Sequence, residues 1–312
     1  MNLRPRPILR SGLSLAALAL VAPLVLGCSA GTVSSPTPAS GGTGQIAVLG
    51  TENFYANLLA AVGGERVTVT SVLNDPNADP HAFESSPQTA AAVADARLVI
   101  VNGLGYDAFM DKLLAAAPDP TRVVINVQQL LGLADGSNTH VWYDPVTMPK
   151  VANAAADALA KLDPGHAADY ATREQAYLAT LAPLAARIAA LKPAMTGLPV
   201  AFTEPVPGDL TAALGLQVLT PAGFQKAVED GTDPAPADVA LERDLLTGHR
   251  VKALLFNSQV VTPLTQQMHD LAVASGVPVV GFSETMPAGA GTFAAWQIGQ
   301  LNALAQALGV TQ

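Results

Sequence analysis

The sequence contains a single cysteine, Cys28, among 312 residues. One thiol excludes an intramolecular disulfide and any metal site built from several thiolates, so metal chemistry in this chain has to use His, Asp and Glu. Charged residues make up only 13% of the chain and aromatic residues only 5%. Acidic side chains outnumber Lys and Arg by 25 to 16, which gives a formal charge of -9 and makes nucleic acid an unfavourable partner.

The start of the chain is typical of a targeting segment. Three arginines lie within the first ten residues, residues 13–27 carry no charge, and Cys28 follows directly. A basic start, a short apolar run and a small residue at the cut describe a secretory signal peptide. The run is shorter than the ~20 residues that a membrane-spanning helix needs.

Residues 25–28 read Val-Leu-Gly-Cys and resemble the bacterial lipobox. This resemblance implies that Cys28 carries a lipid and that the protein is anchored at the extracytoplasmic face of the cell membrane. A signal peptide that is cleaved without lipid attachment and a short membrane anchor are the two alternatives. Residues 29–44 are dominated by Ser, Gly, Thr, Pro and Ala without any charge, which predicts a flexible tether between the anchor and the fold.

Strand and helix patterns then alternate along the chain. Apolar, β-branched runs predict buried strands, and segments of helical periodicity lie between them. This alternation is typical of a parallel sheet covered by helices on both faces. The predicted strands are 45–49, 67–73, 98–101 and 123–127, and the predicted helices are 53–62, 86–94 and 106–116.

From residue 149 the pattern becomes a long, alanine-rich helical stretch. It is interrupted at Asp163-Pro164, where we expect the aspartate to cap a helix and the proline to occupy its first turn. We expect the following helix to end at Lys192-Pro193. A second alternation follows, with strands at 198–202, 217–219, 253–256 and 277–281 and helices at 209–214, 236–247, 261–275 and 292–308.

The predicted fold class is therefore α/β, with two α/β lobes that each contain a mainly parallel sheet and that are joined by one long connecting helix. The predicted boundaries are 1–27 for the signal peptide, 28–44 for the tether, 45–163 for the N-terminal lobe, 164–193 for the connecting helix and 194–312 for the C-terminal lobe.

The five histidines occupy two kinds of position. His81 and His140 follow the carboxyl ends of predicted parallel strands, where open α/β sheets bind ligands. His166, His249 and His269 fall on polar helix surfaces or helix ends, where we expect them to be solvated. Position alone leaves a structural role open for His81 and His140.

The segments around these two histidines resemble motifs of one family, the cluster A-I substrate-binding proteins of ABC importers for zinc and manganese. Residues 79–84 read Asp-Pro-His-Ala-Phe-Glu, and residues 138–145 read Asn-Thr-His-Val-Trp-Tyr-Asp-Pro. The resemblance covers essentially the whole mature chain. It implies a third ligand at Glu204, eleven residues before the glycine of a Gly-Leu pair, and a fourth at Glu284, after the last predicted strand.

The implied metal site consists of His81, His140, Glu204 and Glu284, in the crevice between the lobes. Two neutral imidazoles and two carboxylates suit Zn²⁺ or Mn²⁺, and their formal charge of -2 balances a divalent ion. Asp79 and Asp144 are candidates to support a ligand histidine from behind. For Asp144, a turn cap before Pro145 is an equal alternative.

The resemblance implies a lipid-anchored binding protein, and not an enzyme, that captures Zn²⁺ or Mn²⁺ and delivers the ion to an ABC permease. Two features depart from the zinc members: residues 132–138 hold only one charged side chain, and the third ligand is Glu, as in manganese-type sites. A secreted zinc-dependent hydrolase is the alternative from another class, although the sequence has no His-Glu-x-x-His or Gly-x-Ser-x-Gly motif. An adhesion role is a third possibility, compatible with metal binding.

Overall fold

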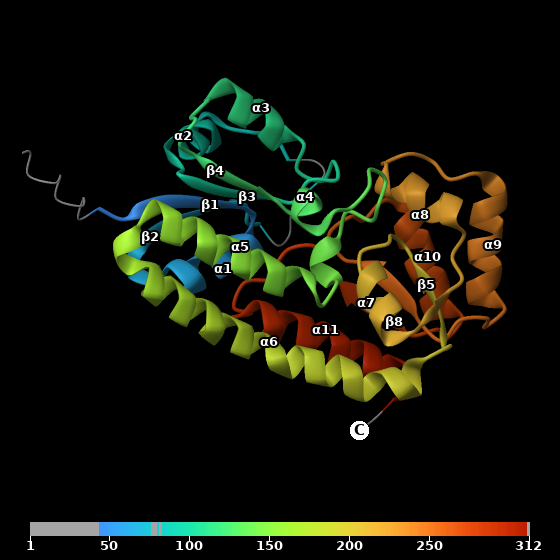
Figure 1. Cartoon of the computed structure of the whole chain (residues 1–312). Coiled ribbons are helices and arrows are strands. Elements are labelled where there is room, and N and C mark those ends of the chain that lie inside the picture. The colour runs from blue at the N-terminus through green and yellow to red at the C-terminus, as the bar shows by residue number, and fades with distance from the viewer. Residues whose placement is uncertain (1–43, 76–79, 81–82, 311–312) are drawn as a thin grey trace, which may run out of the picture. The chain divides into compact units, whose positions relative to one another are not determined.

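Two four-stranded parallel sheets organise the chain in the computed structural model (Figure 1). The structure describes residues 44–75, 80 and 83–310, so Cys28, Asp79 and His81 lie outside the described residues. Gly44–Gln312 forms one unit that contains both sheets. The predicted fold class of two α/β lobes joined by a long helix is confirmed.

The N-terminal lobe contains the sheet β2-β1-β3-β4. All four residues of β3 are buried, as expected for a central parallel strand with helices on both faces. The strands are β1 (Ile46–Glu52), β2 (Val67–Leu73), β3 (Leu98–Val101) and β4 (Val123–Asn126), and the helices are α1 (Asn53–Gly63), α2 (Pro87–Asp95), α3 (Phe109–Ala116) and α4 (Val127–Leu131).

The local sequence determines where two of these helices, α2 and α3, begin. Ser86 accepts a hydrogen bond from the Thr89 N–H at 3.1 Å, and Pro87 opens α2, as the sequence predicts. Helix α3 begins three residues later than expected because positions 103–105 all have positive φ and form a turn. Asp107 stabilises this turn by accepting the N–H groups of Asn102 and Gly103.

The connecting segment consists of α5 (Thr147–Leu162), the 3-10 turn η4 (Pro164–His166) and α6 (Ala167–Met195). The prediction that the long helix ends at Lys192-Pro193 is wrong, because α6 continues to Met195. Leu191 and Met195 are fully buried, so packing of the last turn offsets the hydrogen bond that Pro193 cannot donate.

The predicted cap at Asp163 is also wrong. Its side chain makes no capping hydrogen bond. The carboxylate instead accepts from Arg66 at 3.1 Å and from the Tyr170 hydroxyl at 2.9 Å, and it contacts His166. The side chains of these three partners occupy the carboxylate oxygens, which are therefore not used to cap the backbone N–H groups of the helix.

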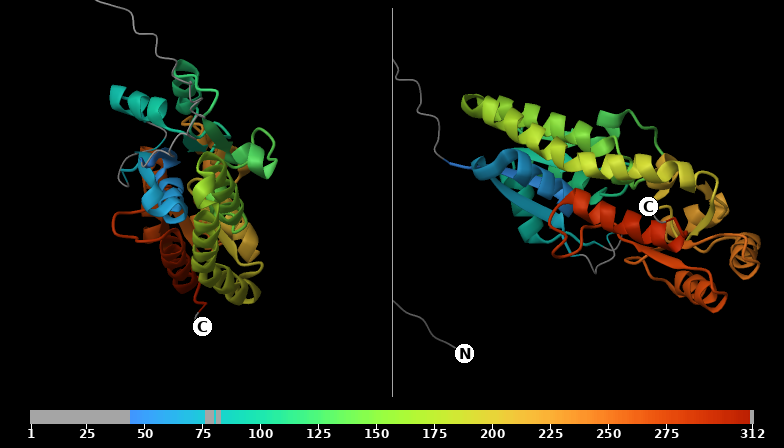
Figure 2. Two further views of the ribbon diagram at one scale, coloured as in Figure 1. Left: turned by 60° about the vertical axis from the view of Figure 1, so that its left-hand side comes forward. Right: turned by 90° about the horizontal axis from the view of Figure 1, so that it is seen from below.

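Helix α6 lies along both lobes and packs against α1, α5, α7 and α11 (Figures 1 and 2). By length and composition alone, Pro164–Met195 could span a membrane. Its buried residues recur at helical spacing, including Tyr177, Leu181, Leu184 and Ile188, and they belong to the largest hydrophobic cluster of the fold. Packing against this core therefore explains the apolar stripe that these residues form along the helix.

The C-terminal lobe contains the sheet β6-β5-β7-β8, also parallel throughout. Its helix α8 has no counterpart among the predicted elements. The strands are β5 (Pro199–Phe202), β6 (Gln217–Val218), β7 (Leu254–Asn257) and β8 (Val279–Phe282), and the helices are α7 (Gly208–Leu214), α8 (Ala222–Glu229), α9 (Pro236–Thr247), α10 (Pro263–Ala274) and α11 (Phe293–Ala307).

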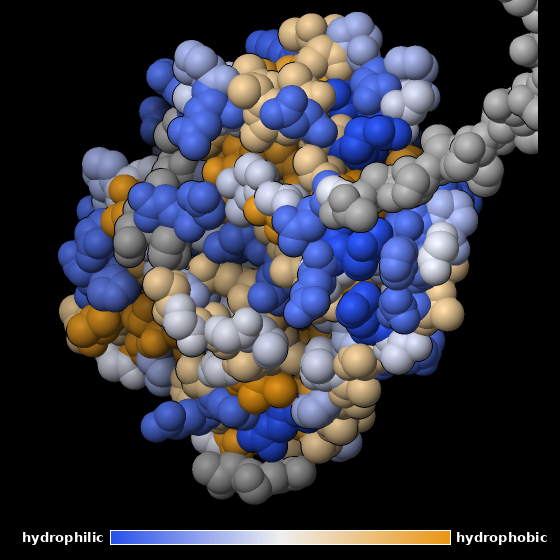
Figure 3. All heavy atoms as spheres, turned by 90° about the vertical axis from the view of Figure 1, so that its left-hand side faces the viewer, coloured by the Kyte–Doolittle hydropathy of each residue, from blue (hydrophilic) through white to orange (hydrophobic). Residues whose placement is uncertain are grey.

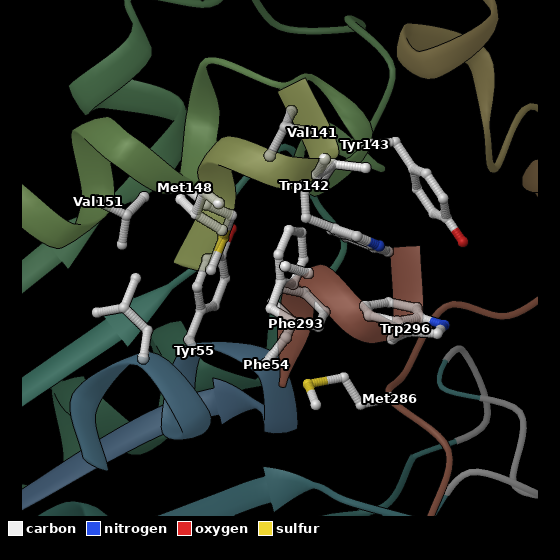
Figure 4. Close-up of a cluster of buried hydrophobic side chains, with 14 of the residues drawn as sticks. Phe54, Tyr55, Val141, Trp142, Tyr143, Met148, Val151, Met286, Phe293 and Trp296 are labelled. Atoms are coloured by element: carbon white, nitrogen blue, oxygen red, sulfur yellow. The ribbon is translucent and has the colours of Figure 1, made fainter. Parts of the chain in front are cut away.

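An aromatic cluster joins the two lobes (Figure 4). Phe54 of α1 lies 4.8 Å from Trp142 and 6.0 Å from Trp296 of α11, measured between ring centroids. Trp142 belongs to the 3-10 turn η3 (Val141–Tyr143), directly after His140. The N-terminal lobe therefore shares its core with the last helix of the chain.

The outer surface contrasts with this core. Although half of all residues are hydrophobic, hydrophilic residues cover much of the face shown in Figure 3, with smaller hydrophobic areas between them. The larger apolar side chains are concentrated in the buried clusters, as the alternating patterns in the sequence require.

Candidate metal centre

The carboxyl ends of three neighbouring strands place two acidic side chains together. Glu204 follows β5 by two residues, and Glu284 follows β8 by two residues. Strand β7 lies between β5 and β8, and its last residue is Asn257. Because parallel strands end at one edge of the sheet, the three side chains meet there although they are far apart in sequence.

Asn257 bridges the two carboxylates. Its Nδ2 group donates one hydrogen bond to Glu204 Oε2 and another, at 2.7 Å, to Glu284 Oε1. Glu204 is 1% exposed and Glu284 is fully buried. Two buried carboxylates that share one hydrogen-bond donor repel each other if both are ionised. One neutral amide offsets only part of the free-energy cost of burying their charges.

Glu284 is held by further polar contacts from both lobes. Tyr106, from the N-terminal lobe, donates its hydroxyl to Glu284 Oε2 at 2.8 Å. Gln259 Oε1 accepts the backbone N–H groups of Glu284 and Thr285. Burial, followed by the nearby Glu284 charge, raises the pKa of Tyr106 well above its usual range, so this hydroxyl stays a donor.

His140 approaches the carboxylates from the N-terminal lobe. Its Nδ1 lies 3.0 Å from Asn138 Oδ1, an acceptor that places the proton on Nδ1 and leaves Nε2 able to bind a ligand. Nε2 lies 3.5 Å from Glu284 Oε2 and has no hydrogen-bond partner within the described part of the chain. The ring makes edge contacts with Trp142 and Tyr106, which fix its orientation.

The electrostatic environment of His140 favours positive charge. Burial by itself lowers the pKa of this imidazole, but the carboxylates of Glu229, Glu284 and Glu204 outweigh burial and raise the pKa above its ordinary value. A proton therefore competes effectively for Nε2 in the absence of another cation. The same negative surroundings favour a divalent ion at this position.

His140, Glu204 and Glu284 together form a buried ligand cluster. One donor atom from each side chain lies within 4.8 Å of the others. The cluster combines one imidazole nitrogen with carboxylate oxygens, a donor set that suits Zn²⁺ and Mn²⁺. Three of the four predicted ligand residues are thus brought together across the two lobes, and the fourth, His81, lies outside the described residues.

The other residues considered in the sequence analysis and described by the structure are not part of this cluster. Asp144 accepts the Val146 N–H at 3.1 Å, which is the turn role considered for it, and Asn138 is the residue that contacts the His140 ring. His166 and His269 are partly exposed and contact the acidic side chains next to them. His249 is exposed and is absent from the ligand cluster found in the described residues.

Sequence reasoning missed the residues that support the cluster, among them Asn257, Tyr106 and Gln259. Asn257 carried a usable signal, because it is a polar residue that ends a buried apolar strand at the same sheet edge as the acids. Tyr106 and Gln259 lie in loops, where the sequence gives no comparable periodicity.

Comparison with known proteins identifies the family. Residues 48–307 match the model of ZnuA, described as zinc-uptake complex component A, periplasmic. The chain belongs to the ZnuA family. This membership confirms the resemblance predicted from the histidine motifs, and the family is that of an uptake component rather than an enzyme.

The individual relatives of this ZnuA-family chain have low sequence identity to it. The manganese-binding lipoprotein MntA of Halalkalibacterium halodurans is 27% identical over 165 residues, which cover 52% of this chain and 53% of MntA. The chain thus spans about half the length of this curated relative. Two solved structures are each 21% identical and share the fold over 85% of this chain.

The first of these structures is the periplasmic zinc-binding protein TroA from Treponema pallidum, with a TM-score of 0.73 and 99% of its chain covered. The second is the SBP FpvC from Pseudomonas aeruginosa in complex with Mn²⁺, with a TM-score of 0.71 and 98% of its chain covered. Both likenesses support the two-lobed fold described above.

Proposed function

We propose that this protein is the extracytoplasmic binding component of an ABC importer, which captures Zn²⁺ or Mn²⁺ and delivers the ion to a permease. The observation that carries the proposal is the convergence of His140, Glu204 and Glu284, almost fully buried, with one donor atom of each within 4.8 Å of the others. Buried carboxylates at such a distance are expected where a cation compensates them.

The proposed ligands of the transported ion are His81, His140, Glu204 and Glu284. Each of the three described ligands already has a polar partner that orients it: Asn138 for His140, and Asn257 for both glutamates. Such supporting contacts are typical of metal sites, where they set the geometry of the ligands. Four protein ligands leave no open coordination position for hydrolysis, which argues against the hydrolase alternative.

The donor set accommodates both candidate ions. Two carboxylates raise the oxygen content of the site, which favours Mn²⁺ relative to a site made only of nitrogen. The general order of divalent affinities still places Zn²⁺ above Mn²⁺. The relatives include one protein of each kind, the manganese-binding lipoprotein MntA and the zinc-binding protein TroA, and are consistent with either ion.

Attachment to the membrane through a lipid on Cys28 belongs to this proposal. It rests on the uncharged run before Cys28, on the lipobox-like residues 25–28 and on the similarity to MntA, which is a lipoprotein. The first strand begins at Ile46, and the uncharged composition of residues 28–44 supports their proposed role as a tether that lets the metal site reach the permease.

Metal content tests the proposal directly. The full chain, purified in detergent under native conditions, should contain about one equivalent of Zn²⁺ or Mn²⁺ by elemental analysis. Calorimetric titration of the metal-stripped chain should give one saturable site, with Zn²⁺ at least as tight as Mn²⁺. At 100 times the Kd, bound metal stabilises the folded state by about 2.7 kcal/mol, so Tm should rise by on the order of 5–10 °C. Absence of a saturable site for either ion would contradict the proposal.

A further inference from the structure

Several hydrogen bonds join the lobes near the metal centre, including the Tyr106–Glu284 contact, and two sets of them bear on the release of an ion. In the first, Asn53 at the start of α1 donates to the Met286 carbonyl and accepts the Met286 N–H, both at 2.9 Å. Asn57 of the same helix donates to the Gly291 carbonyl at 3.3 Å. The chain that follows Glu284 is therefore bound to α1 through its backbone, and this side of the junction is firmly connected.

The second set lies beside His140. Thr139 Oγ1, from the N-terminal lobe, donates to Glu229 Oε1 at 2.6 Å, and Glu229 is the last residue of α8 in the C-terminal lobe. The other carboxylate oxygen, Oε2, lies 3.8 Å from His140 Nδ1. Figure 1 shows the segment between α4 and α5 reaching α8 at this place. Asn138 Nδ2 of the same loop also donates to the Pro205 carbonyl at 3.1 Å, so Thr139–Glu229 is the contact that joins this loop to α8, beside a second contact to the chain after β5.

This contact forms part of the wall of a cleft of about 270 Å³ between the lobes. The cleft is lined from both sides, by Asn138 and Thr139 of one lobe and by Pro205, Gln225 and Glu229 of the other. Thr139 and Pro205, which line the cleft, are the sequence neighbours of His140 and Glu204, and the three described ligands are at most 1% exposed. An ion bound among them therefore has to wait for a local opening before it leaves.

We propose that Glu229 is a positioning residue and that the Thr139–Glu229 contact is a latch of the metal site. While the contact is closed, it holds the His140 loop against α8. When it opens, the cleft connects the ligands to solvent, and the Asn53–Met286 contact keeps the lobes together. This proposal rests on the proposed function and adds to it the place where the ion is released.

The latch predicts a kinetic effect that a general loss of charge does not reproduce. A hydrogen bond to a charged group is strong enough that its removal should raise the rate of metal release about tenfold or more. Thr139→Val removes the hydroxyl while keeping the shape and the charge of the site. Glu229→Gln removes the charge of the acceptor, and Asp230→Asn is its matched control because Asp230 is exposed and paired with Lys226.

The experiment measures release of Zn²⁺ from the loaded full chain after mixing with excess EDTA. The fluorescence of Trp142, whose ring lies 5.3 Å from that of His140, follows the release in a Trp296→Phe background. We expect each single variant to release Zn²⁺ about tenfold faster than the parent. The Thr139→Val, Glu229→Gln double variant should release it no faster than the faster single variant, because both changes break one contact. Asp230→Asn should stay within twofold of the parent.

Three results would overturn the latch. Additive effects of the two substitutions would mean that they act independently, and an equal effect of Asp230→Asn would mean that charge alone matters. Unchanged release in both single variants, with tight Zn²⁺ binding in the parent, would refute the latch and leave the proposed function intact. A parent chain without Zn²⁺ binding would refute the proposed function, and the latch with it. Melting curves of the metal-free variants verify that each one folds.

Discussion

At the scale of single residues, the metal centre depends on neutral side chains that hold charged ones. Asn257 donates to Glu204 and to Glu284, and Asn138 accepts from the ring of His140. Neither amide can neutralise the carboxylates, so the cluster keeps a net attraction for cations. This combination of fixed ligand geometry and buried carboxylates is what a binding site for a divalent ion requires.

Removal of a ligand should weaken binding strongly. Loss of a supporting residue behind a ligand costs about 10–100-fold in metal affinity, so Glu204→Ala, Glu284→Ala, His140→Ala and His81→Ala should each exceed roughly a hundredfold. His269→Ala serves as the control, because this side chain lies outside the ligand cluster. Competition titrations against a chelator measure the affinities. If Glu284→Ala bound as tightly as the parent while His269→Ala did not, the assignment of the fourth ligand would be wrong.

Metal binding should depend on pH through His140. The imidazole must be neutral to bind metal, and the carboxylates of Glu229, Glu284 and Glu204 raise its pKa despite its burial. Metal affinity should therefore fall as the pH drops, beginning above the ordinary His value of about 6.5. The folding stability of the metal-free protein should change with pH in the opposite direction. The raised pKa of His140 contributes stability that is fully present below about pH 6.5 and is lost as the pH rises through the folded-state pKa. Zn²⁺ titrations between pH 5.5 and 8, about the range in which His titrates, measure the first effect. An affinity that did not change over this range would contradict it.

At the scale of elements, strand ends do most of the positioning. Strands β5, β7 and β8 are each only four residues long, yet their shared edge brings Glu204, Asn257 and Glu284 together. The helices have a different role, because they cover the sheets and bury side chains that do not take part in binding. Helix α9 buries an acidic side chain, and this burial changes the pKa of that side chain.

Glu242 of α9 is fully buried, with the Thr220 hydroxyl 3.2 Å from one of its oxygens. Burial raises the pKa of Glu242 to about 8, so the carboxyl is neutral in the fold at pH 7. The unfolded chain releases this proton near pH 4.5, and stability should therefore fall by about 1.4 kcal/mol per pH unit between about pH 4.5 and 8 on account of this group alone.

Glu242→Gln should abolish that contribution. Relative to the parent, its free energy of unfolding should increase with pH across this window, measured by urea denaturation at several pH values. Asp244→Asn, on the exposed side of the same helix, is the matched control and should leave the pH dependence of the parent unchanged. A constant difference between Glu242→Gln and the parent at all pH values would show that Glu242 keeps the same protonation state in the folded and unfolded chain.

At the scale of the whole molecule, the lobes are joined by a common core as well as by a linker. Phe54 from near the start, Trp142 from the middle and Trp296 from near the end of the described chain pack into one cluster (Figure 4). Separation of the lobes as rigid bodies would expose these rings to water, at a cost of roughly 25 cal/mol per Å² of apolar surface. Local opening at the Thr139–Glu229 contact avoids this cost.

Attachment of the chain to a membrane is also a property of the whole molecule. We expect Cys28→Ser to leave the precursor unprocessed or to release the protein, because a hydroxyl cannot take the place of the thiol that would carry the lipid. Fractionation of cells, followed by detergent phase partitioning, measures the change. Ser29→Ala is the control at the neighbouring position. If the Cys28→Ser variant were still processed and held at the membrane by a lipid, the anchor would lie elsewhere.

Much of the fold was predictable from local patterns. The β-branched runs that became β2 and β3 were located at the correct residues, and so was α9, which begins with a proline, because such runs and an initial proline are signals within a few neighbouring positions. The short helices α4 and α8 were missed, although α7, which has seven residues, was predicted to within one residue, so helices of this length leave only a weak periodic signal. The predicted domain boundaries and the role of His81 remain predictions.

The sequence by itself determined the family and the histidine motifs, because both depend on the order and spacing of neighbouring residues. Only the tertiary structure decided which partners hold the candidate ligands. Asn257 lies 53 residues from Glu204, and Tyr106 lies 178 residues from Glu284. Such contacts depend on the order of strands within a sheet and on the packing of one lobe against the other. Neither leaves a local signal in the chain, because both follow from the burial of apolar surface by the molecule as a whole.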